Sequence, residues 1–149
     1  MTNCTYQLEL FQGYRHRKIE VNFEGGNVTS DGGVLFVREA DRILDLTRRA
    51  AAMIHDPRRQ ASCIHEVREM LKQRVYGLCL GYEDLNDHDD LRKDAAIQTA
   101  VERDKDLASS PTLCRFESWA DRQVAMKINE LLMDMFIESH KYPQEEIIL

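Results

Sequence analysis

The chain has 149 residues, 43% hydrophobic and 31% charged, with a formal net charge of −6 at pH 7. These values are typical of one soluble globular domain, and no apolar run approaches the roughly 18–20 residues that a membrane-spanning helix requires. The first six residues lack the charged and apolar regions of a secretion signal. We therefore expect a single compact unit, located in the cytoplasm and without a membrane partner.

The four cysteines, Cys4, Cys63, Cys79 and Cys114, are far apart and form no CxxC pair. This spacing indicates neither a zinc site nor a disulfide framework. We expect free thiols, most of them buried.

Charge is unevenly distributed along the chain. Residues 38–74 contain nine basic and six acidic side chains, whereas residues 75–149 contain eight basic and sixteen acidic ones. A basic first half is consistent with a face that meets phosphate groups, and equally with ordinary solvated helix faces. Charge alone leaves both interpretations open.

Residues 1–31 show the alternation of a small β element. Ile19, Val21 and Phe23 alternate with polar residues, which predicts a half-buried strand, and residues 6–10 are a candidate partner. Gly25–Asn27 provides residues suited to a tight turn, after which Val28–Thr29 is again extended.

Residues 32–143 have helical periodicity. Capping residues and apolar spacing predict helices over about 32–47, 62–80 and 91–103, and one long helix that starts at Pro111 and continues for some six turns. Seven residues form the apolar face of this long helix: Leu113, Phe116, Ala120, Val124, Ile128, Leu131 and Met135. Met126, Met133 and Met135 are interpreted as core residues.

The acidic segment 82–90 has the composition of a calcium loop but not its pattern. Counted from Asp84, an EF-hand requires glycine where Asp89 stands and a bidentate glutamate where Ala95 stands. We expect a polar turn in which Asp87, Asp89 or Asp90 caps the next helix, and no metal site.

The helix over 91–103, a polar turn and the helix that opens at Pro111 form a candidate helix-turn-helix. In that geometry Thr112 and Arg115 lie at the exposed start of the second helix, where they can reach phosphates or base edges. The alternative is a packed helical hairpin in which Arg115 pairs with an acid such as Glu117. No nucleophile elbow, P-loop or HExxH motif is present, and His65 and His88 are interpreted as structural or solvated.

Several stretches resemble the N-terminal region of bacterial DDE transposases of the insertion-sequence-1380 family. They follow the same order over about residues 18–149: residues 25–35, 73–78, 80–88, 107–113 and 115–117. A departure is Cys114, where the family pattern has a small polar residue such as serine.

The resemblance implies an N-terminal helical region for DNA binding and synapsis, followed by a ribonuclease-H-like core whose acidic triad holds two Mg²⁺ ions. None of the matched positions is one of those carboxylates, so no catalytic or metal-binding residue is assigned and no cofactor is expected in this chain. The implied partner is the double-stranded DNA of transposon ends. The candidate phosphate contacts are Arg48, Arg49, Arg58, Arg59 and Arg74, with Thr112 and Arg115 as candidates for base edges.

The predicted fold is α+β and mainly helical, with a β element at 1–31, a helical region at 32–143 and, at 144–149, the first strand of a truncated catalytic core. The predicted function is the non-catalytic, DNA-binding part of a transposase. The alternatives are a module for self-association or for inactive complexes with a full-length transposase, and a decayed remnant.

Overall fold

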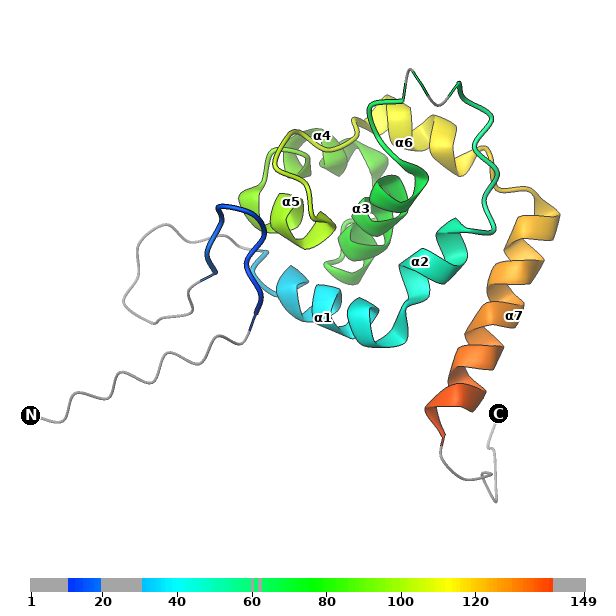
Figure 1. Ribbon diagram of the computed structural model, residues 1–149. Helices are drawn as coiled ribbons and strands as arrows, with labels where there is room; N and C mark the ends of the chain where they lie inside the picture. Colours follow the sequence, from blue (N-terminus) through cyan, green and yellow to red (C-terminus); the bar gives the residue numbers. More distant parts are fainter. Residues whose placement is uncertain (1–10, 20–30, 60, 62, 141–149) are drawn as a thin grey trace, which may run out of the picture.

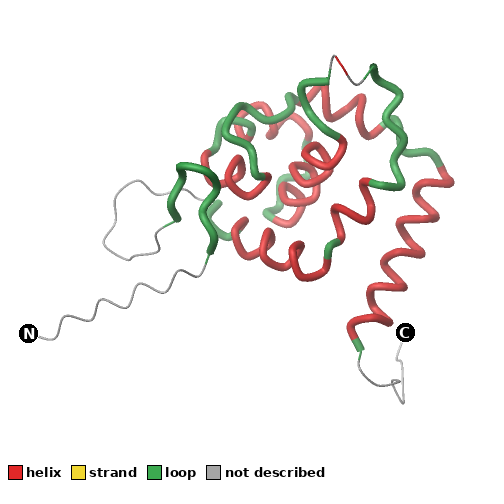
Figure 2. Tube along the Cα trace, viewed as in Figure 1, coloured by secondary structure: helices red, strands yellow, loops and turns green. Residues whose placement is uncertain are grey.

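The computed structural model describes residues 11–19, 31–59, 61 and 63–140. Within these residues the chain folds into seven α-helices and a short 3₁₀ helix, with no extended strand (Figures 1 and 2). The elements are α1 (Val34–Leu44), α2 (Leu46–Ala51), α3 (Val67–Cys79), the 3₁₀ helix η2 (Leu85–Asp87), α4 (His88–Leu91), α5 (Ala95–Val101), α6 (Ser110–Glu117) and α7 (Arg122–Ser139). In the described part of the chain, no helix is both long and apolar enough to cross a bilayer.

The prediction of a mainly helical chain is confirmed. Most of the predicted β element, at residues 6–10 and 20–29, and the predicted core strand at 144–149 lie outside the described residues. The β pairing seen in the described part is an isolated bridge between Tyr14 and Arg17.

The helix predicted over 32–47 is wrong in its continuity, because the chain bends at Asp45. Asp45 has φ of 57°, in the left-handed region that aspartate tolerates better than most residues, and it separates α1 from α2. The carboxylate of Asp41 accepts a hydrogen bond from the Thr47 backbone N–H at 2.8 Å, which satisfies a free donor at the start of α2.

The single long helix predicted from Pro111 is also wrong. α6 ends at Glu117, and Asp121 caps a new helix by accepting a hydrogen bond from the Val124 backbone N–H at 2.8 Å. Most of the predicted apolar face is buried even so, because α6 and α7 each bury their own part of it. Ile128 is half-buried, Ala120 is exposed, and the other five residues are buried: Leu113, Phe116, Val124, Leu131 and Met135.

α3 lies at the centre of the molecule and packs against α1, α2, α5 and α6 (Figure 1). Its buried face is partly polar: Lys72 and Gln73 are buried together with Met70 and Tyr76. The apolar residues that predicted a helix over 62–80 therefore do not mark its buried face well. Two of them, Ile64 and Leu78, are exposed. Each buried polar group has a partner: Lys72 donates to Glu102, and Gln73 exchanges two hydrogen bonds with the backbone of Ala108.

The core consists of adjoining apolar clusters. One joins α1, α3, α4 and α5: Val34, Tyr76, Leu91, Ile97, Ala100, Val101 and Leu107. A second joins α3, α6 and α7: Ile54, Met70, Ala108, Leu113, Phe116 and Val124. A small third cluster, Ala50, Leu131 and Met135, attaches α7 to α2.

Two predictions about burial are corrected. Met126 and Met133 are 55% and 60% exposed, because they lie on the side of α7 opposite Val124, Leu131 and Met135. Cys63, Cys79 and Cys114 are free thiols as predicted, but Cys79 and Cys114 are exposed.

The acidic segment is a polar turn, but with different caps from those predicted. Asp84 caps η2 by accepting from the Asn86 backbone N–H at 2.9 Å, and Asp94 caps α5 by accepting from Ala96 and Ile97. α4 has no side-chain cap; Asp89 instead accepts a hydrogen bond from the Ser110 backbone N–H at 3.0 Å, at the start of α6.

Candidate nucleic-acid interface

The start of α6 is held by side chains from α3 and α4. The amide of Gln73 donates to the carbonyl of Ala108 at 2.9 Å and accepts from its backbone N–H at 3.0 Å. Asp89 accepts from the Ser110 backbone N–H, and Pro111 lies in the first turn, where its missing N–H costs no hydrogen bond. The position of this helix start is therefore set by contacts distant in sequence.

The end of α6 is held as well. Glu117 accepts a hydrogen bond from Arg74 Nε at 2.6 Å, which connects α6 to α3. Phe116 meets Trp119 edge to face, with ring centroids 5.7 Å apart, and the Arg58 guanidinium lies 4.7 Å from the Trp119 ring centroid. With both ends attached, α6 presents its outer face in a set orientation.

The outer face of α6 consists of Pro111, Cys114, Arg115 and Ser118, which are exposed and spaced as one helix face. The Arg115 guanidinium has no hydrogen-bond or ion-pair partner among the described residues, and it does not pair with the nearby Glu117, which pairs with Arg74. Thr112 is half-buried, and its hydroxyl lies 3.1 Å from that of Ser109. The predicted exposure of Arg115 is confirmed, whereas Thr112 is already engaged at the helix start.

The two arginines before α3, Arg58 and Arg59, differ in whether their guanidinium groups already have partners within the chain. Arg58 donates to Asp56, to the carbonyl of His65 and stacks on Trp119; its hydrogen bonds to Asp56 raise the pKa of Arg58. Arg59 is exposed, and its guanidinium has no partner among the described residues. Arg59 is thus available to an external anion, and Arg58 orients Trp119.

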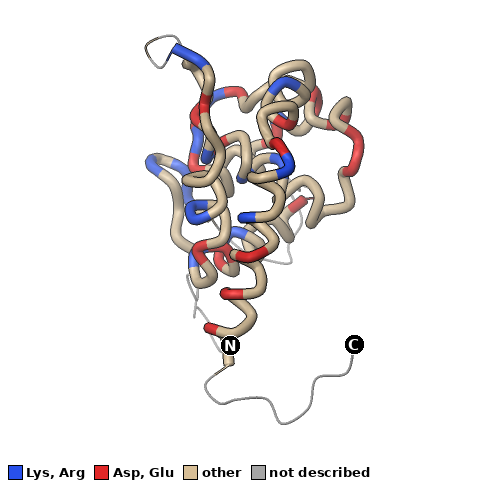
Figure 3. Tube along the Cα trace, turned by 90° about the vertical axis from the view of Figure 1, so that its right-hand side faces the viewer, with Lys and Arg blue, Asp and Glu red and all other residues tan. Residues whose placement is uncertain are grey.

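Arg48 and Arg49 lie on α2, beside a cavity of about 400 Å³ between α2 and α7. Arg48 pairs with Asp45, and Arg49 Nη1 lies 2.7 Å from the Glu138 carboxylate. The remaining charged lining residues are Lys127, Glu130 and Asp134. Figure 3 shows the same mixture over this side of the molecule, where Lys and Arg positions alternate with Asp and Glu positions. The cavity is therefore not a uniformly basic groove.

Arg74 is placed where it serves the fold. Its side chain is 15% exposed, and besides Glu117 it donates to the carbonyls of Tyr82 at 3.2 Å and Glu83 at 2.8 Å. All of these contacts connect α3 to α6 and to the turn before η2. These contacts give Arg74 a structural role, and its contact with phosphate stays a prediction.

The predicted helix-turn-helix is not the observed geometry. Of the helix predicted over 91–103, the structure has α5 at Ala95–Val101, because α4 already ends at Leu91, and eight residues separate α5 from α6. A helix-turn-helix joins its helices by three or four residues. Here α5 packs on α1 and α3, whereas α6 packs on α3 and η2.

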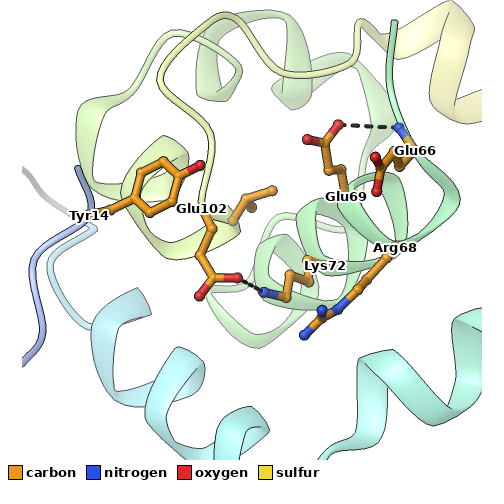
Figure 4. A pocket seen from close by; sticks show the side chains of 7 residues that line it. Tyr14, Glu66, Arg68, Glu69, Lys72 and Glu102 are labelled. Carbon is orange, nitrogen blue, oxygen red and sulfur yellow. Dashed lines mark hydrogen bonds and ion pairs between the residues drawn. The ribbon is translucent and has the colours of Figure 1, made fainter. Parts of the chain in front are cut away.

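A smaller cavity, of about 230 Å³, lies beside α3 and is lined by Tyr14, Glu66, Arg68, Glu69, Lys72, Val101 and Glu102 (Figure 4). The Lys72 ammonium and the Glu102 carboxylate face each other there, 2.7 Å apart. Glu69 pairs with Arg103 at 2.8 Å. Because most of its charges are satisfied internally, this cavity has little charge left to bind an ionic ligand.

A family model described as transposase DDE domain group 1 matches residues 11–149. The chain belongs to this transposase family. No curated protein and no solved structure matches the chain. Membership connects this transposase chain to DNA as its general partner.

In the described part of this transposase chain, no group of side chains fits the Mg²⁺ ions that the resemblance to DDE transposases implies. No three His, Cys, Asp or Glu side chains come together there in a way that holds a metal ion. The carboxylates of the 82–90 segment are used in capping and in the contact with α6. We therefore derive no step through a metal from these residues.

Sequence reasoning missed the residues that hold α6. Gln73, Asp89 and Trp119 carry no motif, and the partners of Gln73 and Asp89 are 35 and 21 residues away. Arg122, exposed at the start of α7 and without a partner among the described residues, was missed too. The one available signal was that the sequence contains a single tryptophan, which lies eight residues after Pro111, within the long helix predicted there.

Proposed function

We propose that this chain is the DNA-recognition part of an insertion-sequence transposase of the 1380 type, and that it binds the double-stranded ends of its element. The observation that carries the proposal is the outer face of α6, where Arg115 projects without a partner among the described residues from a helix attached at both ends. A guanidinium on a rigidly held helix can make the bidentate contact to guanine that gives sequence preference.

Arg59 and Arg122 are proposed as the accompanying phosphate contacts. Both are exposed without an ion pair among the described residues, one in the segment before α3 and one at the start of α7. Contacts of this kind set affinity and register, while the base contact sets preference. The proposed role of this chain is recognition of DNA.

The test is a fluorescence-anisotropy titration of the chain with the presumed element end and with a scrambled duplex. We expect tighter binding to the element end, with affinity that falls steeply between about 50 and about 200 mM salt, since released counterions drive binding. Equal or absent binding to the two duplexes would remove the recognition role.

Arg115→Ala is expected to weaken binding to the element end by about tenfold, as the loss of one bidentate base contact does. Binding to the scrambled duplex should change much less. Lys105→Ala is the matched control, because Lys105 is an exposed cation without a partner among the described residues in the connection between α5 and α6. An equal loss on both duplexes would show that Arg115 contacts phosphate and not a base.

A second candidate function, self-association, is favoured by the outer face of α7. Leu132, Met133, Phe136 and Ile137 are 48–66% exposed, and with Met126 they form an apolar face about 16 Å long at 1.5 Å per residue. The inner face of α7 already packs on α2 and the core. The proposed occupant is the same face of a second copy, because two such faces close on each other around a two-fold axis.

The self-association candidate predicts a concentration-dependent mass in sedimentation equilibrium that varies little with salt, since apolar burial drives it. The double variant Leu132→Gln/Phe136→Gln should be monomeric, whereas Lys127→Gln, on the side of α7 that lines the cavity with α2, should behave as the wild type. A wild-type chain that is monomeric at all concentrations would exclude this function.

A further inference from the structure

The side chain of His88 is buried against the backbone of α3. It is 1% exposed at the start of α4 and lies so close to Gly77 that a Cβ added there would be 2.7 Å from the imidazole Cε1. Gly77 is therefore the place where α3 accommodates the ring.

The hydrogen bonds of Gln73 define the protonation of this ring. Its Oε1 accepts from the Ala108 N–H and its Nε2 donates to the Ala108 carbonyl, so the orientation of the amide is set. The second N–H of Nε2 is left to the His88 Nδ1, 3.3 Å away. Nδ1 is then an acceptor, and the neutral ring carries its proton on Nε2, which has no partner among the described residues.

A proton on Nδ1 would place a donor against a donor. The Gln73 amide cannot turn over to relieve this contact without breaking both of its bonds to Ala108, two residues before α6. Asp89, the residue after His88, holds the Ser110 N–H of the same helix start. A displaced His88 therefore disturbs both contacts that position the start of α6.

Charged groups on four elements, α3, η2, α4 and α6, act on the ring. Burial and Arg74 on α3 lower the pKa of His88, and they outweigh Asp87 and Asp89 beside it and Glu117 on α6, which raise it. The folded chain thus prefers the neutral ring. The corresponding stability is fully present above the unfolded pKa of 6.5 and is lost as the pH falls from there toward the lower folded value.

We propose that Gln73 and His88 are positioning residues for DNA binding by α6, and that uptake of a proton by His88 releases the start of this helix and weakens binding to the element end. This inference rests on the proposed function of α6. Acidification is then expected to weaken DNA binding. This is opposite to the usual effect, because histidines near DNA bind phosphate more tightly when protonated.

The test combines Trp119 emission with anisotropy on the labelled element end, from about pH 7.5 to about pH 4.5, a window that extends below the ordinary range of a histidine because the pKa of His88 is lowered. Trp119 is the only tryptophan and contacts Phe116 of α6, so its emission reports on this helix without DNA. Circular dichroism at each pH supplies the folded fraction. In the wild type we expect an emission change on acidification and an affinity per folded molecule that falls by about tenfold, a usual size for coupling between sites.

His88→Asn keeps an acceptor near the Nδ1 position and cannot titrate, so both changes should disappear. His65→Asn is the matched control: the pKa of His65 is also lowered, chiefly by burial, and the His65 carbonyl accepts from Arg58, which stacks on Trp119. This variant should retain the wild-type response.

The inference is overturned if His88→Asn retains the acid response, or if the wild type shows none while binding the element end specifically. A chain that binds no duplex at about pH 7.5, yet shows the emission change only with His88 present, would exclude DNA-end binding and still support the link between His88 and α6.

Discussion

Replacing Glu102 by glutamine is expected to lower the free energy of unfolding by about 2 kcal/mol, because the buried Lys72 ammonium loses its counter-ion, although Glu102 itself is 31% exposed and partly screened. The Lys72 side chain is 4% exposed, and its Nζ lies 2.7 Å from the Glu102 carboxylate. Glutamine keeps the size and the acceptor oxygen but removes the charge. Urea denaturation followed by circular dichroism measures the difference.

Two further variants distinguish the effect of a buried, unpaired charge from that of losing any ion pair. Lys72→Met combined with Glu102→Gln removes both charges, and we expect it to recover most of the loss, since an apolar side chain needs no counter-ion. Asp45→Asn removes one partner of the exposed Arg48 pair and should leave stability within experimental error. If Glu102→Gln costs no more than Asp45→Asn, the pair between α3 and the residue after α5 is not a stabilising buried contact.

The pH dependence has a definite sign for this pair. Burial alone would raise the pKa of Glu102, but hydrogen bonds from Lys72 and Arg42 outweigh it and lower that pKa below its usual value of 4.5. The contribution to stability is then present above pH 4.5 and is lost as the pH falls through the lower folded value. The double variant should lack this part of the acid destabilisation.

The same pair explains why the inner face of α3 was not predicted. Hydrophobic periodicity identifies a buried stripe only when the buried residues are apolar, and α3 buries Lys72 and Gln73 at its centre. Their partners, Glu102 and Ala108, are 30 and 35 residues away, beyond any local pattern. The stripe in α7 was partly predictable because its inner positions, Val124, Leu131 and Met135, are apolar.

At the candidate interface, too, local spacing predicted some features, whereas contacts with residues distant in sequence were not predictable. Exposure of Arg115 follows from helical spacing after Pro111, and the structure agrees. The fate of Arg74 does not follow from local sequence, because its partner Glu117 is 43 residues away. The breaks at Asp45 and at residues 118–121 were missed since apolar spacing continues through both. The hydrogen bonds that the Asp41 carboxylate accepts from Thr47 and the Asp121 carboxylate from Val124 compete with helix continuation there.

Gly77→Ala is the second large effect, an expected loss of about 2 kcal/mol. In an open helix the substitution would stabilise by roughly 1 kcal/mol, because alanine is the better helix former. Here the new methyl group would lie 2.7 Å from Cε1 and 3.1 Å from Nε2 of a ring that is itself buried, so the ring must move. Its displacement also breaks the contact with Gln73.

Gly33→Ala is the matched control for this steric argument. Gly33 precedes α1, has no positive φ, and a Cβ there would meet no atom within 4 Å, so we expect a change within about 0.5 kcal/mol. His88→Ala in the Gly77→Ala background should recover part of the loss, because it removes the atoms that clash. Equal changes in the free energy of unfolding for Gly77→Ala and Gly33→Ala would mean that the His88 ring moves aside without measurable cost. In that case His88 would not hold α4 against α3, and α6 would stay attached through Gln73, Asp89 and Arg74 without its help.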